Sequence, residues 1–278
     1  MDVLRYVAFS DVPEGGNPAG VVLDAAGADE AAMSAVAAEI GYSETAFVVP
    51  RDDGSLDVRY FSPLMEVPFC GHATVATAVA YARRHGVGEL TFHTQAGPVR
   101  VSTAHRPDGA VSATLVSVPP RTAPIASADL ADLLGALRWS ADELDPGLPP
   151  RVAYAGAWHP VIAAASRERL AVLDYDTEAL PRLMSRHGWT TVDLVWRESP
   201  SVFHARNPFP TGGVFEDPAT GAAAAALGGY LRDLGLVDPP VTLTIHQGDD
   251  MGRPSVIGVT VPGGLDTGIA VTGTAVAL

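Results

Sequence analysis

The chain has 278 residues, of which 47% are hydrophobic, and it carries a formal net charge of −14. All 18 cationic side chains are arginine, so Schiff-base chemistry with a lysine amine is excluded, and nucleic acid and acidic membrane surfaces are not expected partners. The single cysteine, Cys70, excludes disulfides within the chain and cysteine-rich zinc sites. Without a signal-peptide pattern or an apolar run near the roughly 18 residues of a membrane span, we expect a soluble cytoplasmic protein.

The first half of the chain is predicted to alternate strands with two helices. In chain order we expect strands at 3–9 and 20–23, a helix at 29–40, strands at 46–50 and 56–61, a helix at 73–84, and strands at 90–101 and 110–118. The second of these helices is rich in alanine and has no clear polar face. A helix that is apolar nearly all round is normally buried.

The second half repeats this plan after a proline-rich segment, 119–124, which we interpret as a linker. The expected elements are strand 161–165, helix 177–187, strands 193–196 and 202–205, helix 220–234, and strands 241–245 and 255–261. The tail from Gly268 is also strand-like. We expect it to return to the first half.

Matching segments in the two halves indicate an internal duplication. Phe69 and Phe215 each stand four residues before an Ala-Thr pair that opens an alanine-rich helix. Other matches follow in the same order along the chain, roughly 145 to 152 residues apart. We therefore predict an α+β fold of two pseudo-symmetric lobes, 1–118 with 268–278 returning to it, and 119–267. Each lobe would be a mostly antiparallel sheet wrapped round a central helix.

The starts of the two alanine-rich helices are candidate anion sites. The first N–H groups of a helix lack intrahelical partners and lie at the positive end of the helix dipole, so they can hold a carboxylate. The segments 70–75 and 216–221 lead into these two starts. Two such places in one chain suggest a small carboxylate-bearing molecule held between the lobes.

Four side chains near these segments carry possible chemistry, and each also has a purely structural interpretation. Glu44 is either an exposed acid at a turn or a partly desolvated acid and base. Asp217 is either the cap of a helix that starts with Pro218 or a functional carboxylate. His72 is either a structural histidine or a proton relay, and Cys70 is either a small buried side chain or a reactive thiol.

Several well-known motifs are absent from the sequence. The eight histidines show no HxxxH, HxH or HExxH spacing, so we predict no metal site. A GxSxG nucleophile elbow, a GxxxxGK phosphate loop and a GxGxxG fingerprint are also missing. We expect no cofactor.

A set of motifs in family order along the chain resembles the phenazine-biosynthesis PhzF-like isomerase family. The motifs are GNPAGVV at 16–22, SETAF at 43–47, FCGHAT at 69–74, EDPATG at 216–221, and QG at 247–248 followed by MGRP at 251–254. The resemblance implies a diaminopimelate-epimerase-like fold and a cofactor-independent enzyme that is often a homodimer.

The resemblance also implies roles for particular residues. The best-understood family member isomerises trans-2,3-dihydro-3-hydroxyanthranilate by moving a proton, with a glutamate as acid and base. By that resemblance Glu44, His72 and Asp217 are the expected catalytic residues. The expected substrate-binding residues are Asn17, Gly71, Gly221 and Ala222. Ala222 departs from the phenazine enzyme, which has serine there.

These observations favour a cofactor-independent isomerase that moves a proton on a small carboxylate-bearing substrate. Two alternatives stay open at this point. One is a non-catalytic protein that binds a small carboxylate. The other is an epimerase that uses Cys70 together with a carboxylate, because only one thiol is present.

Overall fold

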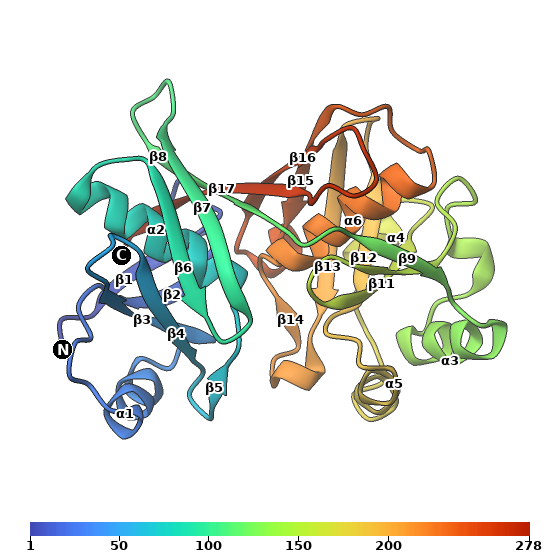
Figure 1. Ribbon diagram of the computed structural model, residues 1–278. Helices are drawn as coiled ribbons and strands as arrows, with labels where there is room; N and C mark the ends of the chain where they lie inside the picture. The colour runs from blue at the N-terminus through green and yellow to red at the C-terminus, as the bar shows by residue number, and fades with distance from the viewer. The chain divides into compact units, whose positions relative to one another are not determined.

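The chain forms two compact units in the computed structural model, which describes residues 1–278 (Figure 1). Unit 1 comprises Met1–Val116 and Thr272–Leu278, and unit 2 comprises Ser117–Val271. The divisions therefore fall after residues 116 and 271, where the sequence placed them after residues 118 and 267. No helix has both the length and the apolar character that a membrane crossing requires.

Unit 1 is built from two helices and a set of short strands. Its elements are β1 (Leu4–Ala8), β2 (Asn17–Val22), α1 (Glu30–Ile40), β3 (Glu44–Pro50), β4 (Leu56–Phe61), β5 (Glu66–Val67), α2 (Gly71–His85), β6 (Glu89–Thr94), β7 (Gly97–His105), β8 (Val111–Val116) and most of β17 (Ala270–Ala277). The helix predicted from residue 29 begins one residue later, because Asp29 caps it by accepting a hydrogen bond from the Ala32 N–H.

The strand pairing of unit 1 alternates in direction. Strand β1 is antiparallel to β2, β2 is parallel to β3, β3 is antiparallel to β4, β4 is parallel to β6, and β6 is antiparallel to β7. Each parallel pair needs a crossover, and α1 and α2 lie in the two crossovers. The last strand, β17, pairs with β1, so the C-terminus returns to unit 1 beside the N-terminal strand (Figure 1).

The two helices of unit 1 pack on opposite faces of its strands. Successive side chains of a strand point to opposite faces, and in β4 the Tyr60 hydroxyl meets Thr74 of α2 at 2.7 Å, while Phe61 packs with Met33 of α1. Ten residues of α2 are buried, and the helix packs against β1, β2, β3, β7 and β8. Its burial confirms what its composition predicted, and its many alanines allow these strands to approach closely.

Unit 2 contains further helices besides those expected from the sequence. Its elements are β9 (Arg121–Pro124), α3 (Ser127–Leu137), η1 (Ala141–Glu143), β10 (Arg151–Tyr154), β11 (Trp158–Ala163), α4 (Arg167–Ala171), α5 (Ala179–His187), β12 (Asp193–Arg197), β13 (Val202–Pro208), η2 (Pro210–Gly212), β14 (Glu216–Asp217), α6 (Gly221–Asp233), β15 (Val241–Gln247), η3 (Asp249–Met251) and β16 (Ser255–Val261). The linker interpretation of 119–124 is wrong for its last four residues, because β9 pairs with β10.

Unit 2 repeats the succession of pairings found in unit 1. Strand β10 is antiparallel to β11, β11 is parallel to β12, β12 is antiparallel to β13, β13 is parallel to β15, and β15 is antiparallel to β16. The short strands β5 and β14 also match, since each is antiparallel to the strand before it. Helices α5 and α6 lie in the two crossovers.

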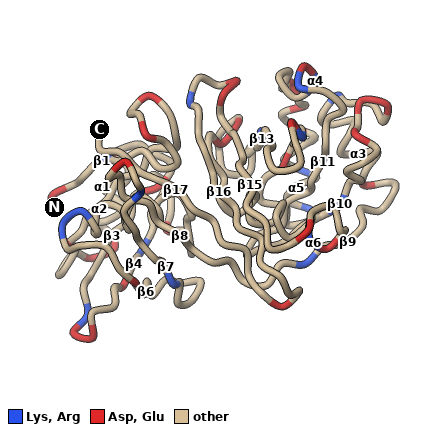
Figure 2. The backbone as a smooth tube through the Cα atoms, turned by 90° about the horizontal axis from the view of Figure 1, so that it is seen from above, with Lys and Arg blue, Asp and Glu red and all other residues tan.

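Helix α6 is almost entirely buried, and two glycines bring it close to its neighbours. A Cβ on Gly228 would lie 2.9 Å from a methyl group of Val259 in β16, and a Cβ on Gly229 would lie 2.3 Å from the ring of Pro120. A second apolar core lies under α3 and α5, where Leu133 is fully buried. Charged side chains gather mainly in loops and at helix ends, and the central strands are largely free of them (Figure 2).

Candidate functional site

A cluster of polar side chains lies at the start of α2 in unit 1. We call it the acid–histidine cluster, and it consists of Asn17, Ser43, Glu44, Cys70 and His72. The Glu44 Oε2 atom lies 3.4 Å from His72 Nε2 and accepts a hydrogen bond of 3.4 Å from the Cys70 thiol. The histidine side chain is 7% exposed and the glutamate side chain 16%, so the carboxylate keeps limited contact with solvent.

The imidazole ring of His72 is contacted at both nitrogens. The Asn17 amide nitrogen lies 3.2 Å from Nδ1, and the Ser43 hydroxyl lies 3.3 Å from Nε2. The Cys70 sulfur is 3.3 Å from Nδ1 and 3.9 Å from Nε2. The ring is therefore held in place by three neighbours and lies next to the carboxylate of Glu44.

The strand register brings these separate segments together. Because β2 and β3 are parallel with Ala19 opposite Glu44, the starts of both strands meet at one edge. Glu44 is the first residue of β3 rather than a turn residue, so the interpretation as an exposed acid is wrong. Helix α2 begins at Gly71, two residues earlier than predicted, which puts His72 in its first turn.

The first turn of α2 supplies backbone donors beside the cluster. Its cap residue, Cys70, makes no side-chain capping bond, and the first helical hydrogen bond comes from the Thr74 N–H. The N–H groups before Thr74, including that of the half-buried Gly71, have no partner within the helix. They lie at the positive end of the helix dipole, which favours a bound carboxylate.

In unit 2, Asp217 belongs to a second hydrogen-bonded group at the start of α6. The Asp217 Oδ2 atom accepts a hydrogen bond of 2.5 Å from the Thr220 hydroxyl. Thr220 is the cap residue of α6, so the interpretation of Asp217 as the helix cap is wrong. Asp217 instead ends the short strand β14 and is buried.

The side chain of Gln247 holds this second group together, a role that sequence reasoning missed. Its amide nitrogen donates to the Asp217 carbonyl at 2.7 Å and to the Thr220 hydroxyl at 2.9 Å, while its carbonyl oxygen accepts from the Thr220 N–H at 3.0 Å. Gln247 is 1% exposed. The QG pair at 247–248 was the available signal, since a buried amide needs partners on both its oxygen and its nitrogen.

A buried ion pair fixes the strand that carries Asp217. Arg206 donates through Nε to Glu216 Oε1 at 2.8 Å and through Nη2 to Oε2, and a third bond of 2.6 Å reaches the Ala171 carbonyl. Such bidentate pairing fixes both side chains in orientation. Because Glu216 precedes Asp217 and Asn207 lies opposite Asp217 in the β13–β14 register, the ion pair positions Asp217.

The two remaining predicted contacts, Gly221 and Ala222, are the first residues of α6. The helix has no side-chain capping bond, and its first helical hydrogen bond comes from the Ala224 N–H. The preceding N–H groups are therefore available to an anion, like those of α2. The structure thus collects Asn17, Glu44, Gly71 and His72 in unit 1, and Asp217, Gly221 and Ala222 in unit 2.

A chain of buried polar side chains crosses β11, β12 and β13 and was not predicted. His159 Nδ1 lies 2.8 Å from the Thr191 hydroxyl, which donates to Asn207 Oδ1 at 2.7 Å, and the Asn207 amide donates to Asp193 Oδ1 at 3.1 Å. We call these four residues the buried polar chain. The outer atoms, His159 Nε2 and Asp193 Oδ2, have no hydrogen-bond partner.

Burial perturbs both titratable groups at the ends of the buried polar chain. It raises the pKa of Asp193 to about 7, against the opposing effect of the hydrogen bond from Asn207. It lowers the pKa of His159 to about 4, against the opposing effect of a hydrogen bond to the Thr191 backbone. Each shift favours the uncharged form, as expected where water is excluded. Both ends are therefore uncharged between about pH 4 and pH 7.

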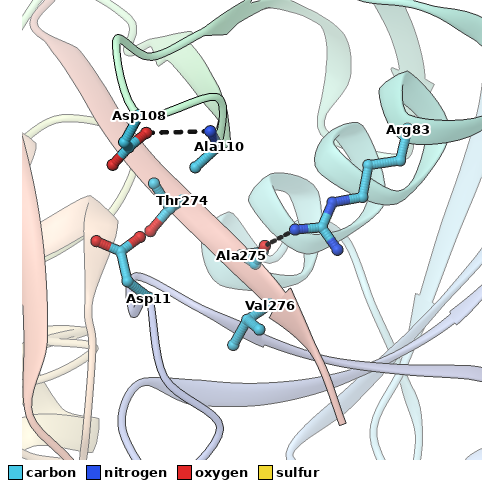
Figure 3. Close-up of a pocket in the computed structure, with 7 residues that line it drawn as sticks. All are labelled: Asp11, Arg83, Asp108, Ala110, Thr274, Ala275 and Val276. Atoms are coloured by element: carbon cyan, nitrogen blue, oxygen red, sulfur yellow. Dashed lines mark hydrogen bonds between the residues drawn. The ribbon is translucent and has the colours of Figure 1, made fainter.

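A shallow pocket of about 270 Å³ lies elsewhere on unit 1, between Arg83 of α2 and the strand β17 (Figure 3). Its two acids, Asp11 and Asp108, are each bound by Arg106. Arg83 donates to the Ala275 carbonyl at 3.4 Å. The charged groups of this pocket thus have structural partners, and it contains none of the predicted site residues.

Comparisons with known proteins match nearly the whole chain to one family. The family model described as phenazine biosynthesis-like protein matches residues 6–278. An uncharacterized isomerase of Bacillus subtilis, YfhB, is 31% identical over 289 residues, covering 99% of this chain and 96% of that protein. A trans-2,3-dihydro-3-hydroxyanthranilate isomerase of Pseudomonas fluorescens is 33% identical over 253 residues, covering 90% of this chain and 86% of that protein.

A solved structure shows the same fold. The PhzF-family phenazine biosynthesis protein of Bacillus anthracis superposes with a TM-score of 0.88 at 26% sequence identity. The match covers 100% of this chain and 98% of that one.

Proposed function

Because the chain belongs to the phenazine biosynthesis-like family of isomerases, we propose that it moves a proton on a small carboxylate-bearing substrate without a cofactor. One observation carries this proposal. Glu44 is mostly buried, and its Oε2 atom lies 3.4 Å from an imidazole that three further side chains hold in place. A carboxylate held in this way can act as a positioned acid and base.

Glu44 is the proposed proton carrier. Its carboxylate removes a proton from a substrate carbon and returns it to a different carbon, so that no net oxidation or reduction occurs. His72 orients the carboxylate and exchanges a hydrogen bond with it as the proton arrives and leaves. Positioned acid and base catalysis contributes on the order of 10² to 10⁴ in rate, so the exclusion of water and electrostatic stabilisation supply the rest.

The substrate carboxylate is proposed to bind the backbone N–H groups at the start of α6, at Gly221 and Ala222. The absence of a capping side chain supports this, because it leaves those donors available. Asp217 is proposed to act on the same substrate as a hydrogen-bonding or proton-accepting group. Asn17 and Gly71 are proposed contacts on the side of the acid–histidine cluster.

The matched strand pairings of the two units support the finer prediction of a diaminopimelate-epimerase-like fold with two pseudo-symmetric lobes. In each unit the second crossover helix is buried against several strands, which supports the idea of a sheet wrapped round a helix. The cleft expected between the lobes and the homodimer stay predictions.

The proposal is tested by following hydrogen exchange in D₂O. The protein is incubated with trans-2,3-dihydro-3-hydroxyanthranilate, the substrate in the name of the Pseudomonas fluorescens relative, and with a panel of other small unsaturated carboxylates. Mass spectrometry and proton NMR then locate deuterium bound to carbon. We expect deuterium at the carbon that receives the proton in at least one product.

The variant Glu44→Gln keeps the shape of the side chain and removes its ability to carry a proton. We expect it to fold normally and to lose at least 100-fold in exchange rate, in line with the usual contribution of a positioned acid or base. The matched control is Glu39→Gln on the exposed side of α1, which should behave like the unmodified protein. Deuterium incorporation at the normal rate by Glu44→Gln would refute the role of Glu44.

The position of Cys70 favours a second candidate, an epimerase that uses its thiol. The sulfur lies 3.3 Å from His72 Nδ1 and 3.4 Å from Glu44 Oε2, so a thiol and a carboxylate are both present. The variant Cys70→Ser separates the two proposals. Loss of exchange at the substrate α-carbon in this variant would support the epimerase, whereas retained exchange supports proton transfer by Glu44.

A further inference from the structure

We propose that Glu44, Cys70 and His72 form a Zn²⁺-binding site. Each residue offers one atom of a type that zinc prefers, and these ligand atoms all lie within 4.8 Å of one another. A carboxylate, a thiolate and an imidazole form a donor set that favours Zn²⁺ over Mg²⁺ or Ca²⁺, which take oxygen ligands.

The distances between these atoms fit a tetrahedral ion. Zinc bonds of about 2.3 Å to sulfur and about 2.0 to 2.2 Å to nitrogen and oxygen place tetrahedral ligands about 3.6 Å apart for sulfur–nitrogen and sulfur–oxygen pairs and about 3.4 Å apart for nitrogen–oxygen. The separations here are 3.9 Å for Cys70 Sγ to His72 Nε2, 3.4 Å for Cys70 Sγ to Glu44 Oε2, and 3.4 Å for His72 Nε2 to Glu44 Oε2. Each lies within about 0.3 Å of the ideal value.

The neighbours of the ring complete the site. A zinc-bound histidine usually donates its other N–H to an amide or carboxylate oxygen. The Asn17 amide lies 3.2 Å from Nδ1, and its oxygen and nitrogen exchange places when the amide is turned end for end. In that orientation the Asn17 oxygen accepts a hydrogen bond from His72 Nδ1–H. His72 Nε2 then binds the metal and no longer contacts the Ser43 hydroxyl.

Binding has a chemical consequence for the thiol and for the fourth coordination position. The Cys70 thiol releases its proton to solvent when its sulfur bonds to the ion, so affinity rises with pH. Three protein ligands leave one tetrahedral position for water or a substrate oxygen. Zinc would also bind the carboxylate of Glu44 and should therefore inhibit proton transfer. This part of the proposal rests on the proposed function.

Cobalt and zinc titrations of the whole chain test the site. Co²⁺ substitutes for Zn²⁺ and gives two spectral signatures. A thiolate ligand produces a charge-transfer band in the near ultraviolet, and tetrahedral coordination produces bands in the visible range. Calorimetry with Zn²⁺ gives stoichiometry and affinity. We expect one ion per chain, and a loss of about 100-fold or more in affinity in Cys70→Ser and in His72→Gln.

The control variant is His204→Asn in unit 2. His204 also lies beside acids, with Nε2 2.6 Å from Glu198 and Nδ1 3.6 Å from Asp249, but it has no neighbouring thiol. It should leave the cobalt spectrum and the zinc affinity unchanged. A spectrum without the thiolate band, or zinc affinity that is equal in Cys70→Ser and the unmodified protein, would overturn the site. Zinc bound at the site without inhibition would instead refute the role of Glu44.

Discussion

Replacing Asp193 by asparagine should make the stability of unit 2 strongly dependent on pH. Burial raises the pKa of Asp193 to about 7 from its ordinary value of 3.8. Between these values the folded protein keeps a proton that the unfolded chain has lost. Asp193 therefore contributes stability that is fully present below about pH 4 and is lost as the pH rises through about 7. The whole shift corresponds to about 4 kcal/mol.

His159 acts in the opposite direction. Burial lowers its pKa to about 4 from 6.5, so the unfolded chain binds a proton in this range that the folded protein does not. Its contribution is present above about pH 6.5 and is lost as the pH falls toward 4. This shift corresponds to about 3 kcal/mol. From about pH 4 to 6.5 the two slopes, each about 1.4 kcal/mol per pH unit, cancel in the unmodified protein.

Each single variant should remove one of these slopes and leave the other. As the pH rises from 4 to 6.5, the free energy of unfolding of Asp193→Asn should increase by about 3 kcal/mol relative to that of the unmodified protein. The reason is that only the titration of His159 then changes the stability. His159→Gln should lose about 3 kcal/mol over the same range. The double variant should again run parallel to the unmodified protein.

Urea unfolding followed by tryptophan fluorescence measures these differences in the right part of the molecule. All four tryptophans of the chain, Trp139, Trp158, Trp189 and Trp196, lie in unit 2. Differences between variants at equal pH cancel the titration of the other acids. The reasoning fails if both single variants keep the pH profile of the unmodified protein, or if their slopes have the same sign.

Other substitutions test the packing around the second group of site residues. Glu216→Gln should lower the free energy of unfolding by about 3 kcal/mol, because Arg206 would keep a buried charge with only the more distant Asp250, at 4.0 Å, to compensate it. The corresponding change in unit 1, Glu66→Gln, should lower the free energy of unfolding by about 1 kcal/mol or less, since the partner arginine of Glu66 is 34% exposed. Similar losses of stability in the two variants would contradict the argument. Gly229→Ala should destabilise α6 by about 1 to 3 kcal/mol through contact with the adjacent proline ring. Gly135→Ala in α3, where an added Cβ meets nothing within 4 Å, should stabilise by about 0.5 to 1 kcal/mol, and thermal melting compares the two.

Local patterns predicted much of the secondary structure. The strand at Leu56–Phe61 was predicted with its observed bounds, and the helix that ends at Ile40 was predicted with its observed end and a start one residue too early. Helix α2 starts two residues earlier than predicted, because the Ala-Thr pair at 73–74 was taken as its first turn. The strand Arg121–Pro124 was missed because the proline pair before it indicates a linker, and only pairing with β10 makes it a strand.

The site was harder to predict because its parts are distant in the sequence. The motifs identified Glu44 and His72 as candidates, but the contact between them depends on the parallel register of β2 and β3 and on the first turn of α2. The histidine spacing predicted no metal site because such motifs place their ligands on one helix, whereas the ligands of the proposed zinc site come from two segments. Asp193 in an apolar strand was the available sign of the buried polar chain, but its partners come from β11, from β13 and from the loop residue Thr191.

The matching pairings of the two units have an evolutionary consequence. In unit 1 Arg59 lies opposite Phe47, and in unit 2 Arg206 lies opposite Leu194, so Glu44 and Thr191, each three residues earlier, hold corresponding places. At this place unit 1 has an acid, whereas unit 2 has a neutral hydroxyl whose hydrogen bonds hold it in the buried polar chain. If Glu44 has the proposed role, substitutions around it can change the substrate while the internal network of unit 2 stays intact.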